Sequence, residues 1–363
     1  MMRLTGRSPG VVNRTLRACP PAAHAGILRS RTGSEKFVAL SGILVFQTDP
    51  MITPAPHPTS RVAILLATRN AANFLNDQLR SYLDQTVEGW SLHVSDDGST
   101  DATVDLLKQF GESHRQLQRV RRGPQQGYVR NFLSLANDRE ITADYFAFSD
   151  QDDIWYPDKL ERALNFLKDI PAAVPALYTS RTELVDESLN HLGFSPLFTK
   201  LPSFQNALVQ NIGGGNTMVF NAATKRLLEL KLDGDVASHD WWTYQVVTAA
   251  GGVVTYDPVP SIKYRQHAGN ILGSNQGARA RMRRIGMLFD SKFKDWNVMN
   301  ISALTGLSLD LNESTQATLD HFVAARNSRS LATRLLHLHR SGVYRQSGLS
   351  NLALIIACAF RKI

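Results

Sequence analysis

Three carboxylates stand within four residues of the sequence, at Asp150, Asp152 and Asp153. Like charges this close together repel one another and raise one another's pKa unless a cation lies among them. A Mg²⁺ or Mn²⁺ ion prefers oxygen ligands, would remove that cost and could bridge a diphosphate. The alternative is a solvated acidic turn before a helix that starts at Pro157. An apolar segment, 145–148, precedes the cluster and would direct it toward a cleft, which favours the metal and diphosphate site.

Two other polar clusters follow apolar segments earlier in the chain. Thr68 and Asn70 come after the segment 62–67, and Asp96 comes after the segment 92–95. Ligands of open α/β sheets bind beyond the carboxyl ends of the strands, so the clusters would meet at one cleft if these strands are neighbours. Asp96 could then accept hydrogen bonds from a base or a ribose. The alternative is a tight turn followed by a capped helix.

Gly127 and Arg130 stand at the start of a helix that we predict for 128–136. The free N–H groups of a helix start, together with an arginine, could bind a phosphate group. An ordinary helix start accounts for the same residues equally well, so both interpretations of this segment stay open.

These clusters need a frame of strands and helices, and the hydrophobic pattern predicts one. The segment 62–67 is continuously apolar, as expected of a strand buried on both faces. We predict strands at 62–67, 92–95, 118–121, 145–148, 176–179, 217–220, 253–256 and 262–264. We predict helices at 71–84, 101–110 and 128–136, near 157 and 239, and in the segment after about 276. This alternation indicates an α/β fold with a mixed, mostly parallel sheet flanked by helices.

The length and bulk composition fit one large α/β domain with a helical appendage, or two domains. The chain has 363 residues, of which 43% are hydrophobic, and a net charge of +8. Residues 1–58 are rich in Arg, Pro and Ser and show little periodicity. We expect them to be disordered or to precede the true start, for which Met51 is a candidate. We therefore divide the chain into an extension at 1–58, a central domain at 59–275 and a helical region at 276–363.

The expected compartment is a reducing cytosol. The two cysteines, Cys19 and Cys358, stand at opposite ends of the chain and indicate neither a disulfide framework nor a zinc site. No run of about 18 apolar residues occurs, so we expect no helix that spans a membrane. Basic and apolar residues mix after 276, as in a helix lying on the anionic inner face of a plasma membrane. Packing against the central domain or a partner chain is the slightly favoured alternative.

Several of these motifs together resemble the inverting family 2 glycosyltransferases, which have the GT-A fold. Residues 65–70 (LLATRN) and 94–101 (VSDDGSTD) resemble the opening of those enzymes. Residues 149–160 (SDQDDIWYPDKL) resemble the extended metal motif of their rhamnosyltransferase-like branch. The resemblance spans about 61–273, and the order and spacing of the motifs agree. It implies a GT-A nucleotide-diphospho-sugar transferase fold at 59–275, a nucleotide-sugar donor and a Mg²⁺ or Mn²⁺ cofactor.

The resemblance also implies a role for each matching residue. Thr68 and Asn70 would lie beside the nucleoside, and Asp96 would hold its base. Asp150 and Asp152 would flank the diphosphate and the sugar. The remaining implied contacts are Gly127 and Arg130 near the nucleotide, Arg265 near the diphosphate, Asp153 at the metal, and His267 near the diphosphate and its metal.

Asp240 matches the catalytic base of the family, and His239 stands where an acidic pair would have its first member. An inverting transfer needs one carboxylate behind the sugar to take the proton of the acceptor hydroxyl, while the metal stabilises the leaving diphosphate. Asp240 could instead cap the helix that starts here, and the two roles are compatible. The tryptophans at 241 and 242 could stack on a sugar, but core packing accounts for them more readily.

The favoured function is an inverting glycosyltransferase that moves L-rhamnose from dTDP-L-rhamnose to a glycan or lipid-linked glycan acceptor in surface polysaccharide synthesis. A UDP-hexose donor is one alternative, and a catalytically silent nucleotide- or glycan-binding module on the same fold is another. A dinucleotide oxidoreductase is disfavoured because no G-x-G-x-x-G follows the first strand. No nucleic-acid partner is expected, and peripheral membrane contact is a further expectation for the helical region.

Overall fold

A central sheet of seven strands organises the computed structural model, which describes residues 60–267, 286 and 291–363 of the chain. The strands are β1 (Val62–Thr68), β2 (Trp90–Asp96), β3 (Leu117–Arg122), β4 (Tyr145–Ser149), β6 (Ala176–Ser180), β9 (Val219–Asn221) and β10 (Val253–Asp257). Their order in the sheet is β10-β6-β9-β4-β1-β2-β3. Only β9 runs antiparallel to its neighbours, β4 and β6, so the sheet is mixed and mostly parallel, as predicted.

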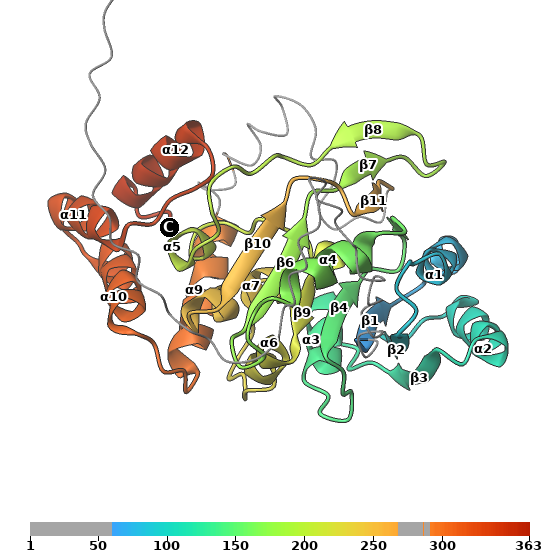
Figure 1. Ribbon diagram of the computed structural model, residues 1–363. Coiled ribbons are helices and arrows are strands. Elements are labelled where there is room, and N and C mark those ends of the chain that lie inside the picture. The colour runs from blue at the N-terminus through green and yellow to red at the C-terminus, as the bar shows by residue number, and fades with distance from the viewer. Residues whose placement is uncertain (1–59, 268–285, 287–290) are drawn as a thin grey trace, which may run out of the picture. The chain divides into compact units, whose positions relative to one another are not determined.

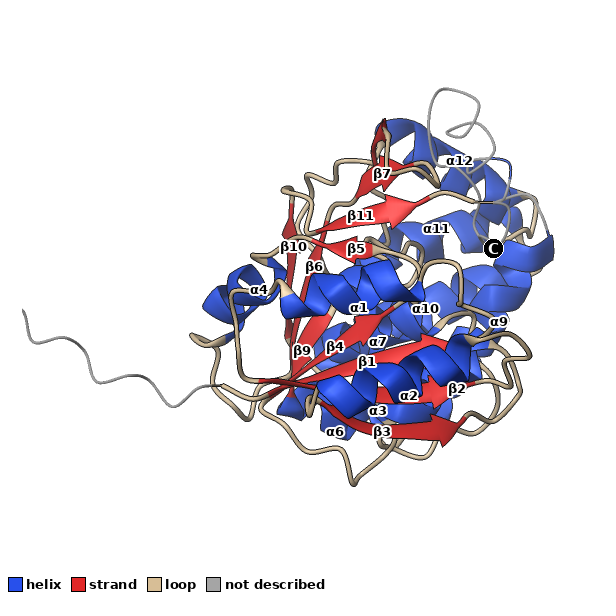
Figure 2. Ribbon diagram, turned by 90° about the vertical axis from the view of Figure 1, so that its right-hand side faces the viewer, coloured by secondary structure: helices blue, strands red, loops and turns tan. Residues whose placement is uncertain are grey.

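Helices cover both faces of this sheet (Figure 1, Figure 2). They include α1 (Leu75–Leu83), α2 (Thr103–Ser113), α3 (Tyr128–Ala136), α4 (Lys159–Leu167), α6 (Ala222–Leu228) and α7 (His239–Ala249). Every residue of β1 is buried. Ala63 and Leu65 enter a core shared with α3, α6 and α7, whereas Ile64 and Leu66 enter a second core shared with α1, α2 and α4. A strand covered on both faces needs apolar residues at every position, which is why this segment lacks alternation.

A second, four-stranded sheet lies beyond the carboxyl ends of the central strands (Figure 1). Its strands are β5 (Ile154–Trp155), β7 (Glu183–Val185), β8 (His191–Phe194) and β11 (Ile262–Arg265), in the order β5-β11-β7-β8. Because β5, β7 and β11 closely follow β4, β6 and β10 along the chain, this sheet must stand at the carboxyl edge of the central one. The second sheet therefore lies at the edge where the candidate residues gather.

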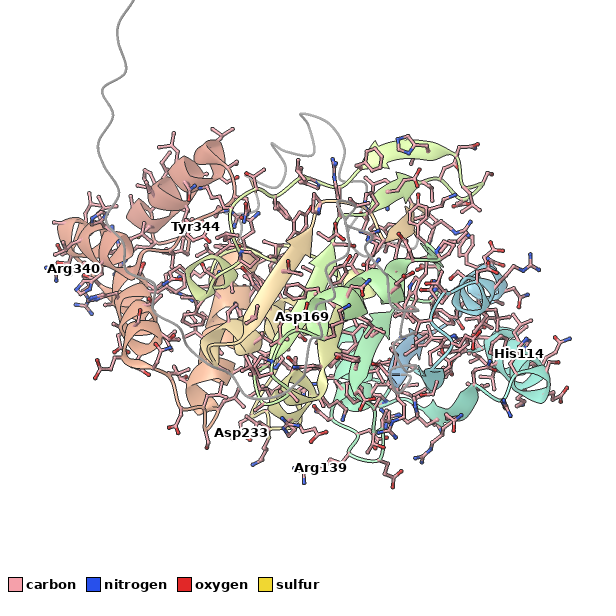
Figure 3. The ribbon with its side chains drawn as sticks, viewed as in Figure 1. His114, Arg139, Asp169, Asp233, Arg340 and Tyr344 are labelled. Carbon is pink, nitrogen blue, oxygen red and sulfur yellow. The ribbon has the colours of Figure 1, made fainter. Side chains whose placement is uncertain are left out.

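Four helices follow at the end of the chain. They are α9 (Ser291–Gly306), α10 (Glu313–Asn327), α11 (Leu331–Ser341) and α12 (Gly348–Ala359). Phe322 and Leu354 belong to the same core as Trp241 of α7, so these helices pack onto the sheet domain. Arg340 lies on the outer side of α11 (Figure 3). Within the described ranges, no helix is both long enough and apolar enough to cross a membrane.

All described residues belong to one compact unit, Ala55–Ile363. The extension expected at 1–58 lies outside the described residues, and so does the boundary expected between 275 and 276. This division of the chain therefore stays a prediction.

Each predicted strand is confirmed, and no strand end differs from its prediction by more than two residues. The helix predicted at 71–84 begins later, at Leu75, because other side chains bind the N–H groups of its first residues. Thr103 Oγ1 accepts the N–H of Ala71 at 2.7 Å, and Asp101 accepts the N–H of Ala72 at 3.0 Å. Sequence periodicity missed the short elements β5, β7, β8, α5 (Phe204–Ala207) and α6.

Candidate active site

The carboxyl ends of β2, β1 and β4 lie side by side, because β1 pairs with both of the other strands. Thr68 at the end of β1 is in register with Asp96 at the end of β2. Gln151, after β4, exchanges hydrogen bonds with the backbone of Arg69: the Arg69 N–H donates to Gln151 Oε1 at 2.7 Å, and Gln151 Nε2 donates to the Arg69 carbonyl at 3.1 Å. The three polar clusters predicted from the sequence therefore meet at one edge of the sheet.

Asp96 holds the turn between β2 and α2 together. One of its oxygens accepts hydrogen bonds from the hydroxyls of Thr68 at 3.0 Å and Ser99 at 2.5 Å. The other accepts the N–H groups of Gly98 at 3.2 Å and Ser99 at 2.9 Å. Asp96 is buried, at 6% exposure, and so is Thr68, at 1%. The turn interpretation accounts for these contacts, and contact of either side chain with a nucleoside stays a prediction.

Asn70 ties the end of β1 to the same turn. Its N–H donates to Ser99 Oγ at 2.8 Å, and its side-chain oxygen accepts the N–H of Thr100 at 2.8 Å. Asn70 adopts the left-handed backbone conformation, with φ of 51°, which asparagine tolerates better than most residues. Because Asn70 is exposed, it can still meet a nucleoside from the solvent side.

Asp97 anchors the start of α3. Its carboxylate accepts the N–H of Gln125 at 2.5 Å and the N–H of Gly127 at 3.1 Å. Gly127 has φ of 89°, a conformation that glycine adopts without strain. The N–H that we predicted near a phosphate is thus bound to a carboxylate of the protein. Asp97 was not among the predicted site residues. Its position in the Asp-Asp-Gly motif was the sequence signal that could have identified it.

Arg130 binds the segment that leads into α7. Its guanidinium donates to Asp235 Oδ1 at 2.9 Å and 2.5 Å and to the Gly234 carbonyl at 2.6 Å. The side chain is one-third exposed, at 33%. This ion pair joins α3 to the chain just before Asp240, and contact with a nucleotide stays a prediction.

The Asp150 carboxylate lies where negative charges converge. Among the described residues, only its backbone oxygen accepts a hydrogen bond, from the Ser149 hydroxyl at 2.8 Å. Burial and the charges of Asp152 and Asp240 raise the pKa of Asp150 to about 8, and Lys159 acts in the opposite direction. At neutral pH this carboxyl therefore either keeps a proton or requires a cation nearby.

Asp153 faces inward. It is fully buried, at 0% exposure, and both of its oxygens are used. One accepts from Asn216 Nδ2 at 2.6 Å and the other from the Arg265 N–H at 3.3 Å, while the Asp153 N–H donates to Gln78 Oε1 at 3.0 Å. Burial and the two neighbouring carboxylates raise the pKa of Asp153. Metal binding by Asp153 stays a prediction, but Asp152, whose side chain is 18% exposed, is the more accessible carboxylate of the pair.

A fully buried lysine lies beneath the acidic turn. The Lys159 amine donates to the Asn216 carbonyl and lies 3.5 Å from the centroid of the Trp155 ring. Burial lowers the pKa of Lys159 well below its usual value, and the charges of Asp153 and Asp150 oppose that shift. In its protonated form, this lysine would offset part of the negative charge from within the protein.

Sequence reasoning missed Lys159, although a signal for it was present. Lys159, Ala163 and Leu167 recur every fourth residue and form the inner face of α4. A charged residue on an otherwise apolar helix stripe, directly after an acidic cluster, indicates a buried partner for that cluster.

Arg265 and His267 support Asp152 from the end of β11. Arg265 is buried, at 2% exposure, and donates to the Asp152 carbonyl at 3.0 Å, the Glu187 carbonyl at 2.5 Å and Asp77 Oδ2 at 2.9 Å. His267 Nε2 lies 2.7 Å from Asp152 Oδ2, and this hydrogen bond raises the pKa of His267. The structure thus brings His267 to a carboxylate of the cluster, while Arg265 braces the turn. Contact of Arg265 with a diphosphate stays a prediction.

Asp240 lies in the first turn of α7 and faces the same charges. Its Oδ1 accepts the Ser238 hydroxyl at 2.5 Å and the Trp241 N–H at 2.7 Å, and its Oδ2 accepts no hydrogen bond from a described residue. Burial and the charges of Asp240 and Asp150 raise the pKa of Tyr128 to about 12. The phenol and the two carboxylates therefore lie close together, and the predicted base is part of the cluster.

His239 is a core residue. It is 4% exposed, its ring stacks on Phe132 with centroids 3.9 Å apart, and neither ring nitrogen has a partner among the described residues. Burial lowers the pKa of His239 to about 4, so the ring is neutral at pH 7. A β-carbon at Gly215 would lie 2.1 Å from His239 Nε2, so this position requires glycine. Trp241 and Trp242 are also buried, which confirms their expected core packing.

The side chains at this edge have the chemistry of a divalent-metal site. Asp150, Asp152 and Asp240 carry carboxylate oxygens and His267 carries an imidazole, which are ligand types that suit Mg²⁺ or Mn²⁺. Residues 60–267 and 291–363 contain no group of three or more His, Cys, Asp or Glu arranged to hold a metal by themselves. The residues present fit an ion that takes its other ligands from a diphosphate and water, as Mg²⁺ commonly does.

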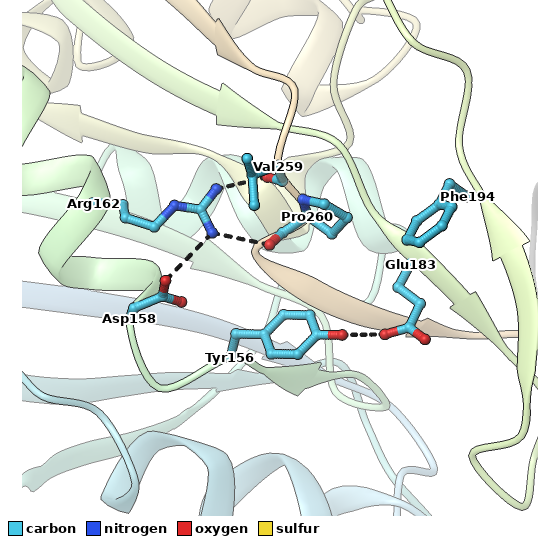
Figure 4. Close-up of a pocket in the computed structure, with 7 residues that line it drawn as sticks. All are labelled: Tyr156, Asp158, Arg162, Glu183, Phe194, Val259 and Pro260. Atoms are coloured by element: carbon cyan, nitrogen blue, oxygen red, sulfur yellow. Dashed lines mark hydrogen bonds and ion pairs between the residues drawn. The ribbon is translucent and has the colours of Figure 1, made fainter.

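A separate cavity of about 330 Å³ opens beside the second sheet (Figure 4). Its lining residues are Tyr156, Asp158, Arg162, Glu183, Phe194, Val259 and Pro260. Tyr156 donates to Glu183, and Arg162 binds Asp158 and the Pro260 carbonyl, so the polar groups largely satisfy one another. None of the predicted site residues lines this cavity.

Comparison with known proteins identifies related chains. Residues 63–228 match the family model described as Glycosyl transferase family 2. The dTDP-rhamnosyl transferase RfbG of Shigella flexneri is 28% identical over 277 residues, which cover 72% of this chain and 91% of RfbG. TuaG of Bacillus subtilis, named for teichuronic acid biosynthesis, is 35% identical over 109 residues, which cover 29% of this chain and 41% of TuaG.

Solved structures share the fold at low sequence identity. Residues 1–349 of S. aureus TarS align with a TM-score of 0.52 and 12% identity, over 83% of this chain and 90% of that one. The structure of the same TarS segment in complex with UDP-GlcNAc aligns with a TM-score of 0.51, at the same identity and coverage. The GT-A transferase fold that the sequence resemblance implied is thereby confirmed.

Proposed function

Because this chain carries a glycosyl transferase family 2 domain at residues 63–228 and is a glycosyltransferase, we propose that it moves a sugar from a nucleotide sugar to a glycan with inversion. The observation that carries the proposal is the convergence of Asp150, Asp152 and Asp240 on one edge of the sheet. Burial and the charges of Asp152 and Asp240 raise the pKa of Asp150 to about 8, which favours a site that binds a cation together with a diphosphate.

Asp240 is the proposed general base. As the acceptor oxygen bonds to the anomeric carbon and the bond from that carbon to the diphosphate breaks, the hydroxyl proton passes to Asp240. The Ser238 hydroxyl and the Trp241 N–H hold Oδ1 and orient the carboxylate, which leaves Oδ2 for the proton. His239 is neutral and buried, so Asp240 would act without a second acid.

We place the divalent ion at Asp152 and His267 rather than at Asp153, which the sequence favoured. Both oxygens of Asp153 are bound inside the protein, whereas Asp152 and His267 meet at the partly exposed side of the turn. When bound, Mg²⁺ or Mn²⁺ would neutralise charge on the leaving diphosphate. Asp150 would then face the donor sugar, and Arg265 would keep the turn in place.

The first-choice donor is dTDP-L-rhamnose, because the similarity to RfbG spans 91% of that protein. Thr68, Asn70 and Asp96, with Gly127 and Arg130, would lie along the nucleotide. A glycan or lipid-linked glycan of surface polysaccharide synthesis is the proposed acceptor, supported by the biosynthetic name of TuaG. A UDP-hexose is the second-choice donor.

The decisive experiment offers the purified chain a panel of nucleotide sugars with Mg²⁺ or Mn²⁺ and follows donor consumption. We expect dTDP-L-rhamnose to be consumed fastest. Asp240→Asn keeps the hydrogen bonds to Oδ1 and should lower kcat about 10²- to 10⁴-fold without weakening donor binding. The matched control is Asp233→Asn, because Asp233 is an exposed neighbour whose ion pair with Lys231 touches nothing in the site.

Other outcomes would redirect the proposal. Donor binding without turnover, unchanged in Asp240→Asn, would identify a silent binding module on the same fold. Faster consumption of a UDP-hexose would make it the first-choice donor in place of dTDP-L-rhamnose. Nuclear magnetic resonance of the product should report an anomeric configuration opposite to that of the donor, and retention would contradict a mechanism with a single base.

A further inference from the structure

The exposed side chains of α12 are all apolar. They are Leu349, Leu352, Ile355, Ile356 and, just past the helix end, Phe360, with exposed fractions from 39% to 68%. The opposite side of the helix, with Ala353, Leu354, Ala357 and Cys358, is buried in the core. A helix that is apolar all round is normally buried all round. In this chain the outer half of α12 remains in contact with solvent.

The stretch of sequence that includes this helix carries charge of one sign. Residues 321–363 contain seven Lys and Arg and neither Asp nor Glu. Arg334 donates to the Ala359 carbonyl and Arg345 to the Val209 carbonyl, so these two serve the fold. The exposed basic residues of this stretch are Arg329, Arg340, Arg361 and Lys362. Arg361 and Lys362 directly follow Phe360, so cationic groups border the apolar surface.

A further exposed apolar side chain stands next to the start of α12. Leu201 is 84% exposed, and its carbonyl accepts the Tyr344 hydroxyl at 2.5 Å. Lys200, also exposed, donates its N–H to Gln346 Oε1 at 2.9 Å. These bonds fix the loop at 200–201 beside the segment that enters α12. Leu201 and Lys200 thus place another apolar residue next to a basic one, as Phe360 and Arg361 do.

We propose that the outer face of α12, with Leu201 and the basic residues beside it, docks onto an anionic lipid bilayer. A bilayer surface supplies both requirements, because its acyl region accepts Leu, Ile and Phe while its phosphate groups attract Lys and Arg. A symmetric contact with a second copy of this chain would set the same cationic groups against each other. A nucleic acid would match the charge but would leave the aliphatic side chains without a partner.

The proposal is tested with the full chain and sedimented vesicles of phosphatidylcholine, with or without about 30% phosphatidylglycerol. We expect binding to the anionic vesicles only, weakened as salt rises because the basic residues contribute. The double variant Leu352→Asp/Ile356→Asp should lower the partition coefficient at least about tenfold. Replacing Arg361 and Lys362 by Gln should lower it about fivefold for each charge removed.

The control is Leu83→Asp/Leu192→Asp, two aliphatic residues with 40% and 45% exposure on α1 and β8. It should bind vesicles as the wild type does, and all variants should retain the wild-type circular dichroism. Three outcomes would overturn the proposal. The control variant could lose as much vesicle binding as the α12 variant, or the wild type could bind neutral vesicles as well as anionic ones. The chain could also form a concentration-dependent dimer that the α12 variant abolishes. Light scattering detects such a dimer. The vesicle-binding result does not depend on the proposed donor or metal.

Discussion

The turn after β2 and the turn after β4 are both rich in aspartate. The two turns differ in the hydrogen bonds that they provide to the Asp96 and Asp150 carboxylates. In the first turn, the Asp96 carboxylate accepts four hydrogen bonds from hydroxyl and N–H groups around it. In the second, the Asp150 carboxylate accepts none from the described residues, and the charges of Asp152 and Asp240 act on it together with that of Lys159. One turn is complete by itself, and the other becomes balanced only with a ligand.

This difference separates structural carboxylates from those free for chemistry. A buried carboxylate with several donors stabilises the fold. A carboxylate among like charges costs stability until a cation arrives. Stability measurements can therefore distinguish the two turns independently of any assay of the reaction.

The largest expected effect is at the buried cation of the second turn. Lys159→Met removes the buried amine that donates to the Asn216 carbonyl and that can carry a positive charge beside Asp153 and Asp150, and it should lower the free energy of unfolding by about 4 kcal/mol. Urea denaturation measures it, with Lys168→Met, an exposed lysine of the same helix region, as control. A loss below about 1 kcal/mol would mean that the acidic turn does not need its lysine.

The first turn should lose stability when its carboxylate is removed. Asp96→Ala leaves the Thr68 hydroxyl and the N–H groups of residues 98 and 99 without their acceptor and should cost about 2–3 kcal/mol. The control is Asp105→Ala on the exposed side of α2, whose surface pair with Lys108 should be worth about 0.5 kcal/mol. The same denaturation curves provide both values, and equal losses would remove the distinction.

Divalent metal should stabilise the second turn alone. At a Mg²⁺ concentration of about ten times Kd, the wild type should gain about 1.4 kcal/mol. Asp152→Asn should lose this gain because it removes a proposed ligand, whereas Asp96→Asn should keep it from a lower starting stability. Thermal unfolding with added Mg²⁺ or with a chelator measures the response. A gain that survives in Asp152→Asn would exclude the proposed ligand.

The smallest effect is expected where a carboxylate is already destabilising. Without metal, Asp150→Asn should raise the free energy of unfolding by about 1 kcal/mol, the equivalent of somewhat less than one pKa unit. It relieves repulsion from Asp152 and Asp240 without removing a side-chain hydrogen bond to any described residue. Denaturation in the presence of a chelator measures the change. A decrease would show that Asp150 supports the fold as Asp96 does.

The sequence predicted the central sheet well because its strands are buried on both faces. A short, continuous apolar run such as that of β1 is typical of a buried strand, and the polar clusters after such runs marked the functional edge. The second sheet escaped prediction because β7 and β8 have three and four residues. Periodicity cannot be recognised in such short segments, and their pairing depends on residues far away in the chain.

The sequence indicated the edge of the sheet where these residues lie, but not the hydrogen bonds and ion pairs of their side chains. Asp150 and Asp152 lie at the predicted edge because they directly follow β4, and the end of a strand fixes where the next residues emerge. Side-chain partners depend on tertiary contacts that the local sequence does not encode. Arg130 pairs with Asp235, which is 105 residues away, and no local pattern predicts such a contact.

Arg265 has a consequence for how the protein is made on the ribosome. Its guanidinium joins the acidic turn to Asp77, 188 residues earlier in the chain, and its N–H reaches Asp153. A nascent chain that ends before β11 can contain every strand of the central sheet but lacks the residue that braces the turn. Contacts across so long a loop form late, because the chain entropy lost in closing it must be offset by structure already present. The acidic turn should therefore acquire its final geometry only after residue 265 leaves the ribosomal tunnel.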